Sequence, residues 1–277
     1  MQRCRSPIAA ASASRKYLER YEERLAHHER YCGCLRAMQD HGHEAPLVKH
    51  SAAALAVFAR APIAGRAKTR LIPALGADGA ARLYAAFLAD TLALAHRAAS
   101  VGLLEPVLWL AAAADTDDPT LRNVPGVAPL PRRVQLTGDL GARMGAALDA
   151  GVASHRAALV IGSDAPTLPL ALLATACAAL TRADLVLGPS ADGGYVLIGA
   201  RVLIGAALFD GVRFSTRHAL ADTLAGAARC GLSAVCVAPW YDVDTPDDLR
   251  LLRTHLTLAP DAAPYTCSAL GLTPHAR

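Results

Sequence analysis

The stretch Leu159–Pro169, LVIGSDAPTLP, combines an uncharged apolar run with one aspartate and a closing proline. An apolar run such as Ala157 to Ile161 is typical of a strand that is buried on both faces. Pro169 suits the first turn of a helix, where its missing N–H would have no partner in any case. The stretch therefore predicts a buried strand, a loop that carries Asp164, and then a helix.

Asp164 is expected just beyond the carboxyl end of this strand. Ligands bind at that edge of open parallel α/β sheets, so a carboxylate there suits ligand binding. An aspartate that caps a turn through its own side chain explains the same position equally well from the local sequence. The other loops of the chain have to decide between these two interpretations.

Short apolar runs alternate with longer segments of helical periodicity from residue 51 to residue 259. The predicted strands are 53–59, 106–110, 133–136, 157–161, 184–187, 195–198 and 234–237, and the predicted helices are 78–98, 141–154, 169–181, 216–229 and 246–255. Strands that alternate with helices of this length imply crossover connections and a mostly parallel sheet. We therefore predict a single α/β domain over residues 51–259.

Two segments lie outside this pattern. Residues 1–50 are rich in Arg, Glu, His and Tyr and are interpreted as an N-terminal extension, partly helical or disordered. Cys32 and Cys34 lie near several histidines there, but their separations do not match the spacings typical of zinc sites. Residues 260–277 show no clear pattern and are interpreted as a C-terminal tail.

The composition excludes several classes of protein. The chain has 277 residues, of which 53% are hydrophobic and 19% charged, so it can bury a substantial core. A net charge of +4 is too small to indicate nucleic acid as a partner. No uninterrupted apolar run reaches the length of a membrane span. The seven cysteines are scattered, which favours a reducing cytoplasm, and oligomeric state is left open.

A basic loop follows the first predicted strand. Four basic residues occur between positions 60 and 70, and among them Lys68 is the only lysine after residue 49. Gly65 gives this loop backbone freedom, and Lys68 and Arg70 suit phosphate binding. The spacing is neither that of a P-loop nor that of a dinucleotide fingerprint. A solvated basic loop is the alternative.

A second loop runs from Gln135 through Gly138 and Asp139 to Gly141. The glutamine amide suits the edge of a nucleobase, and the glycines allow a ligand to approach the backbone. The alternative is that Asp139 simply caps the following helix.

Two acidic loops complete the set. Asp192, Gly193, Gly194 and Tyr195 join two predicted strands, and an ordinary hairpin turn explains the glycines without function. Asp242 and Asp244 alternate in an extended segment before the helix that begins at Pro246, so both carboxylates can point the same way. Together with Asp164 they would offer Mg²⁺ hard oxygen ligands beside substrate phosphates.

Six motifs in order carry a resemblance over residues 55–252: VFARAPIAGRAKTRL, GDLGARM, IGSDAPTL, LGPSADGGYVLIG, FST and YDVDTPDDL. The chain resembles GT-A-type (nucleotide-diphospho-sugar transferase-like) domains, and more narrowly a bacterial family often described as arsenosugar-biosynthesis glycosyltransferases. It is similar, more distantly, to molybdopterin guanylyltransferases and phospholactate-type nucleotidyltransferases. Where the family usually has tryptophan before Ser-Thr, this chain has Phe214, which is expected to alter the packing of the acceptor.

The resemblance implies roles for the loops. Asp164 and Asp244, with Asp242, would hold Mg²⁺ or Mn²⁺, and Lys68 would act in catalysis by contacting phosphates together with Arg70. The segment from Gln135 to Gly141 would lie near the base, and the loop from Asp192 to Tyr195 would face a small-molecule acceptor. Asp192 is the candidate base for the acceptor hydroxyl.

The resemblance leaves three functions open. The first is a glycosyltransferase that uses a nucleotide sugar. The second is a nucleotidyltransferase that uses a nucleoside triphosphate and releases pyrophosphate, which the basic loop favours. The third is a nucleotide-binding module without turnover, which the full set of acidic positions disfavours. The fold itself cannot separate them, because one scaffold hosts all three.

Overall fold

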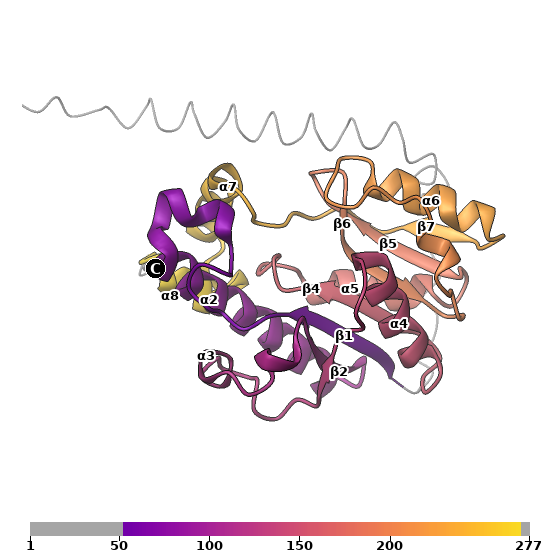
Figure 1. Ribbon diagram of the computed structural model, residues 1–277, viewed down its shortest axis with the longest axis horizontal. Coiled ribbons are helices and arrows are strands. Elements are labelled where there is room, and N and C mark those ends of the chain that lie inside the picture. The colour runs from indigo at the N-terminus through magenta and orange to yellow at the C-terminus, as the bar shows by residue number, and fades with distance from the viewer. Residues whose placement is uncertain (1–51, 273–277) are drawn as a thin grey trace, which may run out of the picture.

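A computed structural model describes residues 52–272, which form a seven-stranded sheet flanked by helices (Figure 1). The strand order is β3-β2-β1-β4-β6-β5-β7, and only β6 runs antiparallel to its neighbours. The strands are β1 (Ala53–Ala59), β2 (Leu104–Leu110), β3 (Arg132–Val134), β4 (Ala158–Gly162), β5 (Leu185–Pro189), β6 (Tyr195–Ala200) and β7 (Ala234–Cys236). The predicted mostly parallel α/β sheet is confirmed.

Helices cover both faces of the sheet. The helices are α2 (Ile72–Ser100), α3 (Pro119–Arg122), α4 (Leu140–Val152), α5 (Leu170–Ala179), α6 (Ala219–Arg229), α7 (Pro246–Leu258) and α8 (Pro264–Ala269). One core cluster joins α2 and α5 to one face of the sheet, and a second joins α4 and α6 to the opposite face. Strand β4 supplies both cores through alternate side chains, with Leu159 and Ile161 in one and Ala158 and Val160 in the other, which explains its uncharged run.

The boundaries of two helices differ from the sequence prediction. Helix α2 begins six residues before Asp78, because a kink at Gly76 (φ 71°) joins a short helical turn to the main helix. Helix α6 begins at Ala219 rather than Thr216, because residues 213–218 form a turn in which Ser215 adopts φ 59°. That turn shapes the site described below.

The segment that we interpret as a C-terminal tail packs on the domain as far as Leu272. Helix α8 lies against α2, and the two gather with α7 at one end of the sheet (Figure 1). The buried carboxylate of Asp90 accepts hydrogen bonds from the backbone N–H groups of Tyr265 and Thr266, at 3.0 and 2.8 Å. This anchor is a contact over long sequence distance, which local periodicity could not indicate. The predicted extension over residues 1–50 lies outside the described residues.

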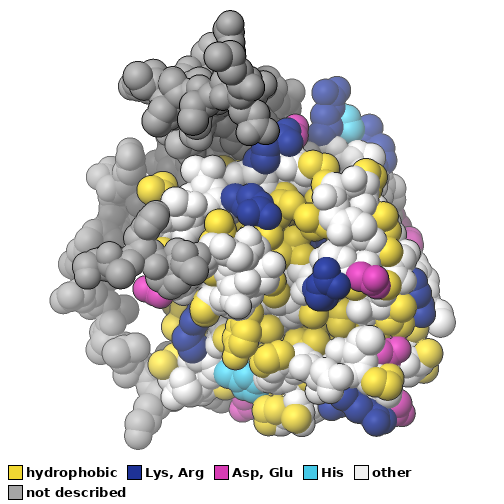
Figure 2. Space-filling model, turned by 90° about the vertical axis from the view of Figure 1, so that its left-hand side faces the viewer, with side chains coloured by type: hydrophobic (Ala, Val, Ile, Leu, Met, Phe, Trp, Pro, Cys, Tyr) yellow, Lys and Arg dark blue, Asp and Glu magenta, His cyan; other side chains and the backbone are white. Residues whose placement is uncertain are grey.

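Thr69–Ser100 is the one described segment long and apolar enough to cross a membrane by length and composition. Its apolar side chains Leu88, Leu92 and Ala95 are buried in the core against the sheet. It thus has the contacts of a core helix. On the face at the α2–α7–α8 end, Lys and Arg side chains lie in separate patches among apolar ones (Figure 2).

Candidate functional site

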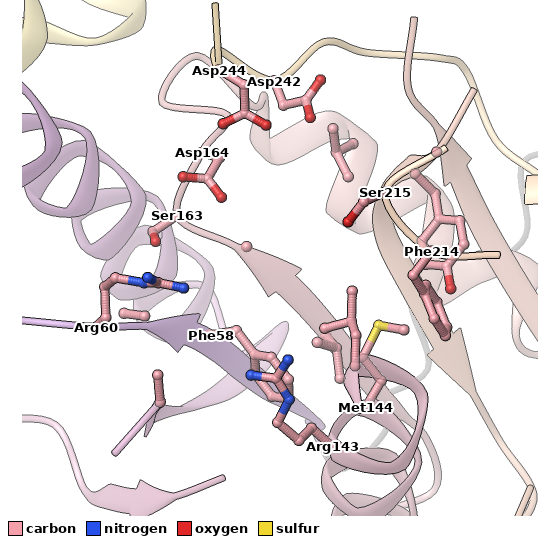
Figure 3. A pocket seen from close by; sticks show the side chains of 18 of the residues that line it. Phe58, Arg60, Arg143, Met144, Ser163, Asp164, Phe214, Ser215, Asp242 and Asp244 are labelled. Carbon is pink, nitrogen blue, oxygen red and sulfur yellow. The ribbon is translucent and has the colours of Figure 1, made fainter. Parts of the chain in front are cut away.

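The loops singled out in the sequence meet at the carboxyl edge of the parallel strands. They surround a cavity of about 510 Å³, a size typical of small-molecule sites. Lys68 follows β1, Gln135 follows β3 and Asp164 follows β4, and all three line this cavity. Asp164, Asp242 and Asp244 lie along one side of it, with Arg60 and Arg143 at a distance on the other (Figure 3).

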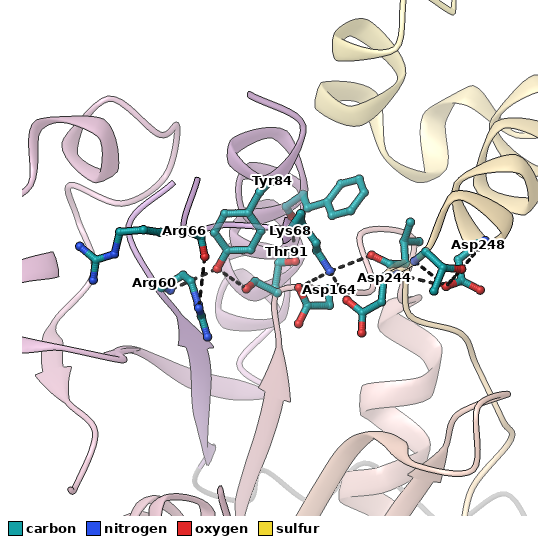
Figure 4. A network of polar contacts seen from close by, with 12 residues as sticks. Arg60, Arg66, Lys68, Tyr84, Thr91, Asp164, Asp244 and Asp248 are labelled. Atoms are coloured by element: carbon teal, nitrogen blue, oxygen red, sulfur yellow. Dashed lines mark hydrogen bonds and ion pairs between the residues drawn. The ribbon is translucent and has the colours of Figure 1, made fainter. Parts of the chain in front are cut away.

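Lys68 lies between two of the predicted metal ligands. Its Nζ is 2.6 Å from Oδ1 of Asp164 and 2.7 Å from Oδ1 of Asp244. It also donates a hydrogen bond to the carbonyl oxygen of Val243 at 2.7 Å, and it lies over the Phe87 ring at 5.6 Å. We call Lys68, Asp164 and Asp244 the lysine clasp (Figure 4).

Burial and charge act in opposite directions on the Lys68 ammonium. Its side chain is only 4% exposed, and burial by itself lowers the pKa of a lysine. The two carboxylates outweigh this desolvation, so the pKa of Lys68 is raised and the ammonium stays charged. The backbone of Lys68 is left-handed, at φ 46° and ψ 47°, just before the 3-10 helix Thr69–Leu71. That turn directs the side chain inward rather than into solvent.

The position of Asp244 depends on the start of α7. Thr245 and Asp248 form a capping box, and the Asp248 carboxylate also accepts a hydrogen bond from the Asp244 N–H. The Val243 N–H donates to the carbonyl oxygen of Asp164 at 2.9 Å, which ties the two acidic loops together. Asp248 is thus structural, as its place in a first helical turn predicts.

Asp242 differs from Asp244 because it forms no ion pair with any basic side chain within residues 52–272. Its Oδ1 accepts a hydrogen bond from the Ser190 hydroxyl at 2.7 Å. Burial, together with the charges of Asp192 and Asp244, raises the pKa of Asp242 to about 6. The structure therefore pairs Asp164 with Asp244 through Lys68 and places Asp242 beside the β5–β6 hairpin.

The hairpin brings Asp192, Gly194 and Tyr195 to the cavity. Asp192 accepts a hydrogen bond from the Gly194 N–H at 2.8 Å, a turn-type contact. Gly193 has φ 94°, and a Cβ there would lie 2.4 Å from the carbonyl oxygen of Arg217. Hairpin geometry therefore accounts for Gly193, while Asp192 still faces the cavity as predicted.

The clasp carboxylates are compatible with a divalent cation. Their side chains are 47% and 40% exposed, each has one oxygen that does not contact Lys68, and hard carboxylate oxygens are what Mg²⁺ and Mn²⁺ prefer. Among residues 52–272, no three His, Cys, Asp or Glu side chains are grouped closely enough to hold a metal by themselves. The donor set thus fits an open site that phosphate oxygens of a ligand would complete.

The basic loop contributes more side chains than predicted. Arg70 and Lys68 line the cavity, and so do Arg60 and Arg66, for which the sequence suggested no separate role. Gly65 does not line it. Gly65 lies in an exposed turn at φ 79°, with open space around it, so its freedom serves the turn, and nucleotide contact at this position stays a prediction.

The second loop agrees only in part with its predicted role. Gln135 lines the cavity, but its Nε2 donates to the carbonyl oxygen of Trp109 at 2.9 Å and its Oε1 accepts from Arg143 at 3.3 Å. Asp139 caps α4 by accepting from the Ala142 N–H at 2.8 Å, as the structural alternative predicts. Gly138 and Asp139 lie outside the cavity lining, so nucleotide contact at these two positions stays a prediction without support.

Gly141 has a packing role. A Cβ at this position would lie 2.6 Å from the Cβ of Phe209 and 3.1 Å from the Phe214 ring, so only glycine lets the two rings approach α4. Sequence reasoning also missed Tyr84, whose buried hydroxyl lies 2.8 Å from the Ser163 hydroxyl and accepts from the Arg60 N–H. Tyr84 lies in a helical apolar pattern, which gave no signal of this contact.

The fold and the cavity at its carboxyl edge define a nucleotide-diphospho-sugar transferase-like domain. The structure is similar to that of a "putative nucleotide-diphospho-sugar transferase" from Desulfovibrio desulfuricans G20, with 29% identity and a TM-score of 0.70, over 78% of this chain and 93% of that one. Residues 91–216 match a family model described as "Uncharacterized protein conserved in bacteria (DUF2064)".

Two further solved structures are more distant. One is 4-diphosphocytidyl-2C-methyl-D-erythritol synthase from Anaerococcus prevotii DSM 20548, with 15% identity, a TM-score of 0.46 and coverage of 74% of this chain and 99% of that one. The other is Rv0371C from Mycobacterium tuberculosis H37Rv in complex with manganese, with 19% identity, a TM-score of 0.43 and coverage of 72% and 97%. No curated protein matches the chain.

Proposed function

We propose that this protein is a cytoplasmic, metal-dependent glycosyltransferase that uses a nucleotide sugar and a small-molecule acceptor. The observation that carries the proposal is the lysine clasp, in which two carboxylates and a buried ammonium meet at the ligand-binding edge of the sheet. The fold similarity to the Desulfovibrio protein supports a nucleotide-activated donor. The free thiols of Cys177, Cys230 and Cys267 suit the cytoplasm.

Charge neutralisation is the main requirement of this chemistry. A nucleoside diphosphate leaves slowly unless the negative charge that develops on it is balanced. Asp164 and Asp244 would hold Mg²⁺ or Mn²⁺, which supplies this balance at the leaving phosphate. Lys68, Arg60, Arg66 and Arg70 line the same cavity and would bind the phosphates as fixed positive charges.

The acceptor hydroxyl attacks the anomeric carbon of the sugar. A bond from the acceptor oxygen to that carbon forms, the bond from the carbon to the phosphate oxygen breaks, and the nucleoside diphosphate leaves with the electron pair. Asp192 lines the cavity opposite the basic loop and is the candidate acceptor of the hydroxyl proton. Most of the rate would come from positioning and electrostatics.

Nucleotidyl transfer is the second candidate, and the number of cationic side chains around one cavity favours it. Five basic residues line the cavity, which suits a triphosphate as well as a diphosphate. In that reaction the acceptor oxygen would bind the α-phosphorus, and pyrophosphate would leave instead.

Product analysis separates the two reactions. The protein is incubated with nucleoside triphosphates and with nucleotide sugars, with Mg²⁺, with Mn²⁺ and with EDTA, while thermal shift and released pyrophosphate or nucleoside diphosphate are measured. Glycosyl transfer predicts stabilisation by nucleotide sugars and release of diphosphate. Release of pyrophosphate would replace this proposal with nucleotidyl transfer.

A variant pair tests the metal assignment in the same assay. Asp164→Asn should abolish the gain in melting temperature that the metal adds to nucleotide. Asp117→Asn, which changes an aspartate whose side chain is 83% exposed, should keep it. A metal effect that is equal in both variants would contradict the role of Asp164.

A further inference from the structure

An apolar wall occupies the part of the cavity that the charged groups leave. It consists of Leu140, Met144, Val160, Tyr195, Ile198 and Phe214. Met144 and Phe214 lie across the cavity from Asp164, Asp242 and Asp244 (Figure 3). Leu140, Tyr195 and Phe214 are only partly buried and present apolar surface to the cavity, whereas Met144, Val160 and Ile198 are buried in the core that supports them.

The wall is built rigidly around Phe214. Ser215 has φ 59°, a conformation that is uncommon outside glycine, in the turn directly after the phenylalanine. The ring of Phe214 lies 5.9 Å from that of Phe209, and Gly141 leaves the space that both rings need. A backbone held in a sparsely populated region at a cavity wall is a common mark of a ligand site.

Tyr195 contributes its ring rather than its hydroxyl chemistry. Its hydroxyl lies 3.4 Å from the hydroxyl of Thr223, and burial raises the pKa of Tyr195 to about 12. The phenol therefore stays protonated at neutral pH and does not serve as a base. Its ring extends the apolar wall toward Asp192, which lies in the same hairpin.

The strand order separates the wall from the phosphate-binding groups. Four of the five basic residues of the cavity come from the loop after β1, with Phe58 and Gln135 on the same side of β4. Val160 lies on β4 itself, and Tyr195 and Ile198 of β6 lie on the other side of it, toward Phe214. A donor bound through its phosphates would occupy the first side, which leaves the apolar wall for the acceptor.

We propose that the acceptor carries its reacting hydroxyl next to a flat apolar group, such as an aromatic or alicyclic ring, that lies on the apolar wall. This inference rests on the proposed function and adds the chemical class of its acceptor. The hydroxyl faces the acidic side of the cavity near Asp192, while Phe214 and Met144 contact the ring. Phe214 sets this specificity because its ring supplies exposed apolar area on a fixed backbone.

Binding of a small alcohol tests the wall directly. Benzyl alcohol and glycerol serve as probes, and their dissociation constants are measured by ligand-observed NMR with and without Mg²⁺. We expect benzyl alcohol to bind at least tenfold more tightly than glycerol, and Phe214→Ser to weaken its binding by about tenfold through lost apolar contact. Phe214→Trp, which keeps an aromatic ring, should retain binding.

A second variant of the wall and a variant outside it serve as controls for the effect of Phe214→Ser. Leu140→Gln changes a half-buried residue of the wall in the first turn of α4, and it should also weaken the binding of benzyl alcohol. This variant tests the wall even if Phe214→Ser does not fold. Leu258→Ala, which changes an apolar residue that is 79% exposed and does not line the cavity, should leave benzyl alcohol binding unchanged. Equal binding of the two alcohols, or a loss in Leu258→Ala as large as that in Phe214→Ser, would overturn the proposal.

A separate measurement, of nucleotide binding, tests the proposed function. Nucleotide binding is followed separately by thermal shift. If benzyl alcohol binds through Phe214 but no nucleotide binds, the apolar site stands and the transferase is refuted. If nucleotide binds to the parent protein and Phe214→Ser weakens nucleotide binding as much as benzyl alcohol binding, the wall holds the donor. The acceptor assignment is then refuted.

Discussion

Two neighbouring acidic regions of the cavity differ in how their negative charge is balanced. In the lysine clasp, Lys68 neutralises Asp164 and Asp244 at 2.6 and 2.7 Å. Beside the hairpin, Asp242 and Asp192 carry like charges, and the Asp242 carboxylate accepts a hydrogen bond from the neutral hydroxyl of Ser190. One region brings its own counter-charge, and the other must take up a proton or an external cation.

This difference separates structure from ligand binding. A clasp with an internal cation is stable before any ligand arrives, so it can fix the geometry of the site in advance. The carboxylates beside the hairpin are stabilised only when a proton or an external cation balances their charge. We therefore expect mutations in the clasp to change stability and binding together, and changes at the hairpin to depend on pH and metal.

The largest effect is expected from Lys68→Met. Removing the ammonium leaves two carboxylates unpaired, which should lower the free energy of unfolding by about 2 kcal/mol, a value reduced because both carboxylates are partly exposed. Nucleotide affinity should fall by about a hundredfold. Urea denaturation and calorimetry measure the two effects.

A matched variant and a metal titration sharpen this result. Arg122→Met removes an exposed ion pair and should leave both quantities nearly unchanged. Added Mg²⁺ should stabilise Lys68→Met more than the parent, because a cation can take the place of the ammonium. If Mg²⁺ stabilises neither protein, metal does not bind at the clasp.

Gly193→Ala should have the next largest effect. Its φ of 94° and the 2.4 Å approach to the Arg217 backbone leave no room for a Cβ, so the hairpin must shift. We expect a loss of about 2 kcal/mol in the free energy of unfolding. Gly65→Ala also has a positive φ but meets no atom within 4 Å, so it should cost about 1 kcal/mol. Equal losses of unfolding free energy in the two variants would show that the close approach at Gly193 does not matter for stability.

The hairpin side should also show a pH dependence in EDTA. The pKa of Asp242 is about 6 in the folded state, against 3.8 for an ordinary aspartate. Between about pH 4 and 6 the unfolded chain loses this proton first, so stability falls as pH rises, by about 3 kcal/mol. The slope in this window should flatten in Asp242→Asn and persist in Asp117→Asn. A slope that survives Asp242→Asn would assign the titration elsewhere.

The smallest effect is expected from Asp139→Ala. Loss of the cap on α4 should reduce stability by about 1 kcal/mol. Nucleotide affinity, measured by calorimetry, should stay within twofold, because Asp139 does not line the cavity. A tenfold loss of nucleotide affinity would instead show that Asp139 contributes to nucleotide binding.

The sequence predicted the fold well where apolar periodicity is strong. The uncharged run in β4, the strand Ala53–Ala59 and the helix that begins at Pro246 all have clear local signals. The grouping of Lys68 with Asp164 and Asp244 followed from the rule that parallel strands end at one edge of a sheet. Loop position could therefore be predicted, whereas the roles of these residues stay predictions.

Direct contacts could not be predicted from local patterns. The bond between Lys68 and Asp244, the use of both ends of the Gln135 amide, and the approach of Phe214 to Gly141 all join residues from different elements. Each depends on side-chain direction across the fold, which periodicity does not carry. Asp139 was ambiguous for a different reason, since a helix cap and a ligand contact use the same residue type in the same place.

The ion pair between Lys68 and Asp244 spans 176 positions of the chain. During synthesis the first half of the domain leaves the ribosome long before the capping box of α7 exists. Lys68 and Asp164 can meet early, but Asp244 joins them only when almost the whole domain has emerged, and such distant contacts form late. A nascent chain that ends between residues 237 and 240 would therefore contain all seven strands of the sheet without a complete site, so that ligand binding would report the arrival of the segment that leads into α7.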